Sequence, residues 1–174
     1  MVSLLANIGI IFLAFYFYLR SKLGILAYQE NRKISYFIKC VFAEVLLGMI
    51  LLSFSIVIMD IRFDFRFLLF CFSAKYLDWK ITSSSIVLLA ILRFFWGSID
   101  IAQTNLLASI MIAVTLPLLV HYTKDKMSDL SQLLILVTIS IIPTILITNH
   151  VIADKSLVLT IGLMLFACGY AATF

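Results

Sequence analysis

The chain has 174 residues, of which 64% are hydrophobic and only 13% are charged, and its formal net charge is +4. Soluble domains are about 45–50% apolar and about 25% charged, so this composition excludes an ordinary water-soluble domain. The cations lie near the ends of the hydrophobic stretches, as residues that set membrane orientation do, and they form no basic stripe with interleaved aromatic residues. We therefore expect the lipid bilayer as a partner and no nucleic acid.

The long apolar runs do not alternate with polar residues, which predicts helices, because lipid leaves only helices or closed barrels with a satisfied backbone. The expected fold is an all-α polytopic membrane helical bundle. Its six or seven hydrophobic segments are residues 2–19, 36–59, 67–79, 81–98, 104–122, 130–148 and 156–174.

The segment 67–79 is shorter than the roughly 20 residues that a membrane span needs, and Lys75 and Asp78 interrupt it. It is predicted to be a short buried helix, a re-entrant piece, or a span that relies on its neighbours. Further along, Ser128 is predicted to cap the helix that follows, with Asp129 in its first turn.

The positive charges indicate an orientation. If residues 67–79 cross the membrane and the N-terminus lies outside, Lys and Arg gather on the cytoplasmic side; if they do not cross, the two sides are nearly equal. The positive-inside rule therefore favours an outer N-terminus and a cytoplasmic C-terminus for one transmembrane domain over residues 1–174. The last segment is apolar to Phe174 with no cationic anchor, so we expect a cytoplasmic output domain after it.

Two charges lie inside apolar segments, where each costs about 2.5–3.5 kcal/mol at mid-helix. Arg93 shares a helix face with Thr82, Ile86, Ala90 and Gly97, which suggests that it faces protein rather than lipid. Three interpretations remain open for it. The side chain extends to the outer interface, pairs with a carboxylate (Asp64, Asp100 or Glu44), or faces a ligand.

Glu44 is the second such charge, and its helix face carries the small residues Cys40, Gly48 and Ser55. Small residues favour close helix packing. Glu44 is predicted either to be protonated with one hydrogen-bond partner, because a deep carboxyl prefers neutrality, or to belong to a ligand site.

Acids and bases alternate in residues 60–66. They predict either a local salt-bridged loop of little energetic value or a ligand site. In a ligand site, two guanidinium groups would hold a carboxylate or phosphate bidentately, oriented by neighbouring carboxylates. The candidate ligand-binding residues are Asp64, Arg66, Arg93, Glu44 and Asp100. No catalytic constellation is visible, the cysteines lack metal spacing, and we expect no metal and no cofactor.

The order Asp64-x-Arg66, a short hydrophobic hairpin, Arg93 and then Gly97 resembles the five-transmembrane receptor domain of the LytS–YhcK type. The resemblance is clearest over residues 56–98, although residues 72–85 lack the glycine that this family usually has there. That domain precedes the output modules of bacterial membrane histidine kinases and of diguanylate cyclases with GGDEF domains. The resemblance implies a signal-sensing input domain in the bacterial cytoplasmic (inner) membrane.

We accordingly expect a domain that binds a small anionic or zwitterionic ligand between its helices, acts as a homodimer and regulates a cytoplasmic output. Whether the native protein is an enzyme stays open, since this chain would be only the membrane part of a kinase or cyclase. The alternatives are a substrate-binding membrane subunit of a small-solute transporter and a structural membrane assembly protein.

Overall fold

The structure, a computed structural model, describes residues 34–58, 61–95, 99–124, 126–151 and 155–171, together with residues 7, 9–13, 16 and 173. Residues 7, 9–13 and 16 are helical. The elements that follow are α2 (Ile34–Ser53), β1 (Ile56–Ile58), β2 (Ile61–Phe63), α3 (Arg66–Tyr76), α4 (Trp79–Leu92), the 3-10 turn η1 (Arg93–Phe95), α5 (Ile99–Thr123), α6 (Asp129–Val151) and α7 (Lys155–Ala171). The described chain is thus a helical bundle with one small hairpin, which confirms the all-α expectation for its body.

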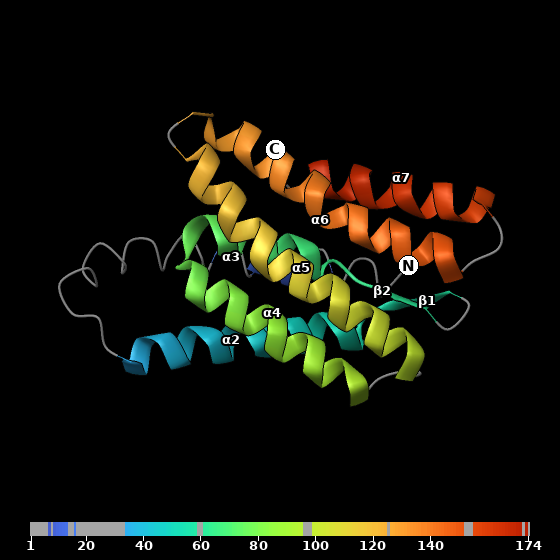
Figure 1. Cartoon of the computed structure of the whole chain (residues 1–174), viewed down its shortest axis with the longest axis horizontal. Helices are drawn as coiled ribbons and strands as arrows, with labels where there is room; N and C mark the ends of the chain where they lie inside the picture. The colour runs from blue at the N-terminus through green and yellow to red at the C-terminus, as the bar shows by residue number, and fades with distance from the viewer. Residues whose placement is uncertain are drawn as a thin grey trace.

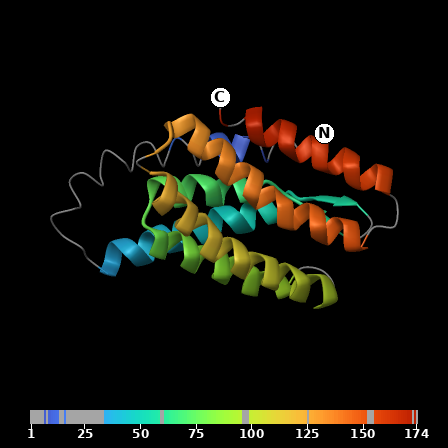
Figure 2. The same cartoon turned by 45° about the horizontal axis from the view of Figure 1, so that its top comes forward.

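The helices lie side by side along the long axis of the molecule, with α7 on one flank and α4 on the other (Figures 1 and 2). Polar contacts define the two ends of this bundle. At one end, which we call the hairpin end, Arg93 at the close of α4 meets Asp64, just after β2. At the other, the lysine end, Lys75 near the close of α3 meets Asp129 at the start of α6.

The short helix α3 lies at the centre of the bundle. Its 11 residues extend about 16 Å, and every residue from Phe67 to Ala74 is buried. It packs against α2, α4, α5 and α6, so it has no face left for lipid. The structure therefore shows a short buried helix in this region, one of the three predicted alternatives, and whether this helix crosses a membrane stays a prediction.

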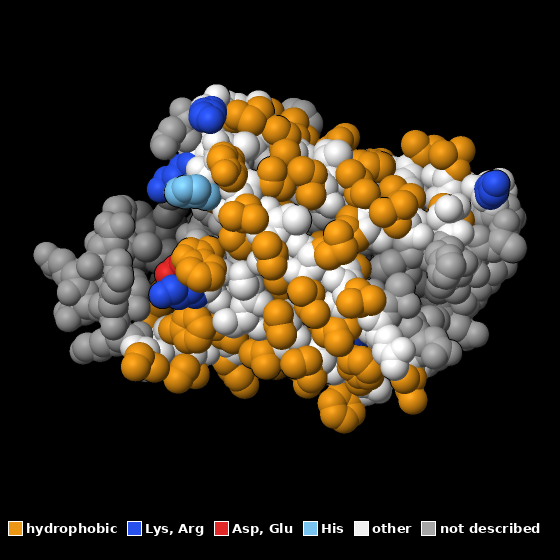
Figure 3. All heavy atoms as spheres, in the orientation of Figure 1, with side chains coloured by type: hydrophobic (Ala, Val, Ile, Leu, Met, Phe, Trp, Pro, Cys, Tyr) orange, Lys and Arg blue, Asp and Glu red, His pale blue; other side chains and the backbone are white. Residues whose placement is uncertain are grey.

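Three helices are long and apolar enough to cross a membrane, at Ile34–Ser53, Asn105–Thr123 and Asp129–Leu146. Large apolar side chains on these helices and on α7 point outward, and Phe42, Met111, Leu146 and Leu163 are each more than 60% exposed. Figure 3 shows hydrophobic side chains across the middle of one face and charged ones at its two ends. An apolar exposed surface of this extent is typical of membrane contact.

The predicted segment 36–59 was wrong at its end, because α2 stops at Ser53 and a hairpin follows. The hairpin pairs Ile56 with Phe63 and Ile58 with Ile61 in antiparallel register. The β-branched run at residues 56–58 favours an extended backbone, and apolar content alone could not separate it from the helix before it. The hairpin replaces part of the loop expected at residues 60–66.

Candidate functional site

Asp64 organises the hairpin end. Its Oδ1 atom accepts hydrogen bonds from the Arg66 backbone N–H at 3.0 Å and from Arg66 Nε at 2.7 Å. The backbone bond is the turn that Asp side chains commonly form with the residue two positions ahead. The carboxylate therefore both shapes the start of α3 and fixes the direction of the Arg66 guanidinium.

Arg93 approaches the same carboxylate from α4. Its Nη1 atom lies 3.9 Å from Asp64 Oδ2, and each of these two side chains is only 5% exposed. Arg93 thus lies inside the protein. One of its three interpretations required the side chain to extend to the exposed surface, and the structure does not show this. The pairing of Arg93 with Asp64 was another, and the structure shows it.

The structure therefore brings Asp64, Arg66 and Arg93 together, and we call these three residues the arginine cluster. Two guanidinium groups face the Asp64 carboxylate, so the formal charges of these three side chains sum to +1. The Arg66 side chain is 12% exposed, so the cluster is almost closed but not sealed. A nearly desolvated guanidinium fork suits bidentate binding of a carboxylate or phosphate.

The structure places Glu44 elsewhere. It lies at mid-length in α2 and is 2% exposed, and its Oε2 accepts a hydrogen bond from Ser73 Oγ of α3 at 2.9 Å. Gly48, which shares its helix face, is buried against Leu89 of α4. Glu44 is therefore a separate polar site, apart from the arginine cluster with which the sequence had grouped it.

Asp100 lies in the first turn of α5, and its side chain is outside the described part of the structure. Residues 60 and 97, which belong to the charged stretch and to the family resemblance considered above, also lie outside the described residues. Among the described residues, no three His, Cys, Asp or Glu side chains gather to hold a metal ion.

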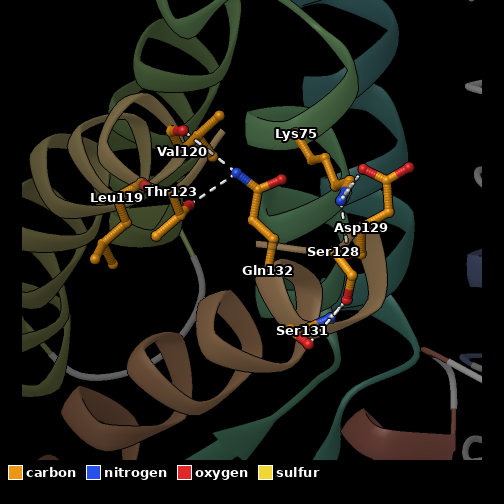
Figure 4. Close-up of polar contacts among 8 residues, drawn as sticks. All are labelled: Lys75, Leu119, Val120, Thr123, Ser128, Asp129, Ser131 and Gln132. Carbon is orange, nitrogen blue, oxygen red and sulfur yellow. Dashed lines mark hydrogen bonds and ion pairs between the residues drawn. The ribbon is translucent and has the colours of Figure 1, made fainter. Parts of the chain in front are cut away.

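The sequence analysis missed the polar contacts of the lysine end. Lys75 Nζ lies 3.0 Å from Asp129 Oδ1 and donates to the Asp129 carbonyl oxygen at 2.6 Å. Gln132 of α6 donates to Thr123 Oγ1 at 2.8 Å and to the Val120 carbonyl at 3.3 Å, so α3, α5 and α6 are tied together there (Figure 4). Lys75 inside an apolar run was a visible signal, but its partner could not be identified without the topology.

The helix cap predicted at Ser128 is confirmed. Its hydroxyl accepts a hydrogen bond from the Ser131 backbone N–H at 3.3 Å, three residues into the helix, and Asp129 lies in the first turn. Figure 4 shows this cap beside the Lys75 contacts.

Comparison with known proteins gives no match to a family model, to a curated protein or to a solved structure.

Proposed function

We propose that the chain is the membrane-embedded input domain of a bacterial signalling protein, and that a small anionic or zwitterionic ligand binds beside Arg66 and Arg93. The observation that carries the proposal is the arginine cluster itself: two guanidinium groups lie against the buried carboxylate of Asp64. Burying charged groups is costly even when they are paired, and a protein that only needed packing would use apolar residues there.

The position of the arginine cluster suits the control of a conformational equilibrium. Arg66 is the first residue of α3, and Arg93 directly follows α4. A ligand held by both arginines would therefore fix the position of α3 relative to α4. At its other end α3 reaches α6 through Lys75 and Asp129, and α6 packs on α7. A change at the hairpin end can therefore pass along α3 to the last helix.

The energies required are modest. A ligand that prefers one of two states by about 1–3 kcal/mol shifts their populations usefully. Each charge-assisted hydrogen bond contributes about 1.5–3 kcal/mol, so one or two such bonds made in only one state are sufficient. We further propose that the lysine end faces the cytoplasm of a bacterial cell, and that α7 leads to a homodimeric histidine kinase or diguanylate cyclase module.

The test is ligand binding by the full chain in lipid nanodiscs. Calorimetric titrations with acetate, inorganic phosphate and a panel of amino acids as probes would compare the wild type with Arg66→Gln and Arg93→Gln. Lys155→Gln is the matched control, because Lys155 is an exposed cation at the start of α7. We expect both arginine variants to lose binding and the control to keep it.

If a probe binds and the two arginine variants bind it as well as Lys155→Gln does, the assignment of the site is wrong. The transporter and assembly-protein alternatives receive no specific support from the described residues.

A further inference from the structure

A second polar cluster lies in the interior, between three helices. Glu44 of α2, Ser73 of α3, and Thr82 and Ser85 of α4 are each at most 2% exposed. Ser73 Oγ is 2.9 Å from Glu44 Oε2 and 2.8 Å from Thr82 Oγ1, and Ser85 lies close to the same carboxyl. We call these four residues the glutamate cluster.

No counter-ion accompanies this carboxyl in the part of the chain that the structure describes. The ion pairs among the described residues join other side chains. Helices α3 and α4 present hydroxyl groups to Glu44, and its titratable neighbour on α2 is the thiol of Cys40. An unpaired carboxylate in an apolar interior is strongly disfavoured, so the group is neutralised by binding a proton or a metal cation.

The hydrogen bonds of the glutamate cluster can run in either direction. When Glu44 is ionised, Ser73 donates to Glu44 Oε2 and Thr82 donates to Ser73. When Glu44 carries a proton on Oε2, the donors and acceptors exchange roles at the same distances. Glu44 then donates to Ser73, and Ser73 donates to Thr82. Thr82 donates to the Asp78 carbonyl oxygen, 3.5 Å away. Each hydroxyl then donates one hydrogen bond and accepts another.

The second carboxyl oxygen fits the protonated form as well. Glu44 Oε1 and Ser85 Oγ are both buried, and neither has a hydrogen-bond partner among the described residues. A neutral carboxylic acid needs one acceptor for its proton and one donor for its carbonyl oxygen. Ser73 is positioned to be the acceptor, and rotation of the nearby Ser85 hydroxyl would supply the donor.

Among the described residues, the polar contacts of the glutamate cluster lead toward the lysine end. Asp78, at which the hydroxyl chain ends, is exposed and caps α4 at the lysine end. Toward the hairpin end, the buried side chain of Leu89 lies against Gly48, one turn of α2 beyond Glu44. This apolar contact separates Glu44 from the arginine cluster.

We propose that Glu44 is an internal proton-binding site that is loaded from the lysine end through Thr82 and Ser73. Thr82 is buried, so the proton enters as a hydronium ion that passes the first turn of α4 beside Asp78. The hydronium ion gives one proton to the Thr82 hydroxyl and leaves as water, Thr82 passes its own proton to Ser73, and Ser73 passes its own to Glu44 Oε2. Both hydroxyls are restored, the carboxylate becomes a carboxylic acid, and one proton is bound. Its occupancy changes the charge where α2, α3 and α4 meet, independently of any ligand at the arginine cluster.

The experiment is infrared difference spectroscopy of the full chain in lipid nanodiscs, which resolves the carbonyl band of a buried carboxylic acid. We expect this band at neutral pH in the wild type and its loss in Glu44→Gln, a neutral variant of the same shape. Ser73→Ala removes one hydrogen bond and should shift the band without abolishing it, which identifies the group even if Glu44→Gln folds poorly.

The route is tested by deuterium exchange of the same band. Thr82→Val breaks the hydroxyl chain and should slow the exchange, whereas Thr138→Val makes the same chemical change at a hydroxyl between α6 and α7 and should leave the rate unchanged. Three results would overturn the proposal: no band attributable to Glu44, a band that disappears when sodium replaces a bulky organic cation, or exchange in Thr82→Val as fast as in the wild type.

Discussion

Replacing Asp64 with Asn would test the energetic role of the arginine cluster. The substitution keeps the shape of the side chain but removes the charge that Arg66 and Arg93 share. Breaking a buried ion pair by removing one partner costs about 3–5 kcal/mol, because the remaining charge is left uncompensated. Arg66 is 12% exposed and can regain some hydration, so we expect the lower end, about 3 kcal/mol, or roughly a hundredfold in the unfolding equilibrium constant.

Asp129→Asn is the matched control. It makes the same chemical change in the Lys75–Asp129 pair, where the Asp129 side chain is 85% exposed. The Lys75 side chain is 5% exposed, but it would still donate to the carbonyl oxygen of residue 129, and the solvent around the exposed Asp129 carboxylate weakens its attraction for Lys75. The expected loss is therefore smaller than that of Asp64→Asn.

The assay is reversible unfolding of the full chain in mixed micelles, followed by circular dichroism over a range of detergent composition. The reasoning predicts a large loss for Asp64→Asn and a smaller one for Asp129→Asn. Equal losses, or a more stable Asp64→Asn variant, would refute the inference that the carboxylate neutralises two buried guanidinium groups. A double-mutant cycle with Arg93→Met would then show whether the 3.9 Å contact contributes at all.

Two further predictions concern packing and capping. Gly169→Ala would place a Cβ atom 2.8 Å from Val137 Cγ1. We expect the contact between α6 and α7 to loosen, which lowers the free energy of unfolding by about 1–3 kcal/mol. Gly9→Ala is the control, because its new Cβ atom would meet no atom within 4 Å. Ser128→Ala removes the hydrogen bond from the Ser131 N–H and should cost about 1 kcal/mol in the same unfolding assay. Ser128→Asp should retain stability, and equal losses in both variants would contradict the capping role.

Helix periodicity predicted the buried faces well. Thr82, Ile86 and Ala90, which share a face with Arg93, are all at most 3% exposed. The sequence shows such faces because residues three or four positions apart project from the same side of a helix. A charge on the lipid-facing side is costly, so a charged residue marks the side that faces protein.

Pairings between distant residues could not be predicted in the same way. The contacts of Glu44 with Ser73 and of Lys75 with Asp129 depend on how α3 fits between its neighbours. Asp64 was one of three carboxylates considered for Arg93, and the sequence alone could not show that it approaches Arg93. The hairpin was missed for a local reason, because its strands are as apolar as the helix before them.

The burial of α3 has a consequence for biogenesis. Its 11 residues cover about half of the roughly 30 Å hydrocarbon core, and Lys75 lies in its last turn. The carboxylate that neutralises Lys75 belongs to Asp129, 54 residues later in the chain. Helix α6, which brings this carboxylate and packs on α3, is synthesised long after α3. The last turn of α3 therefore gains its counter-ion only when the C-terminal half of the chain has been made.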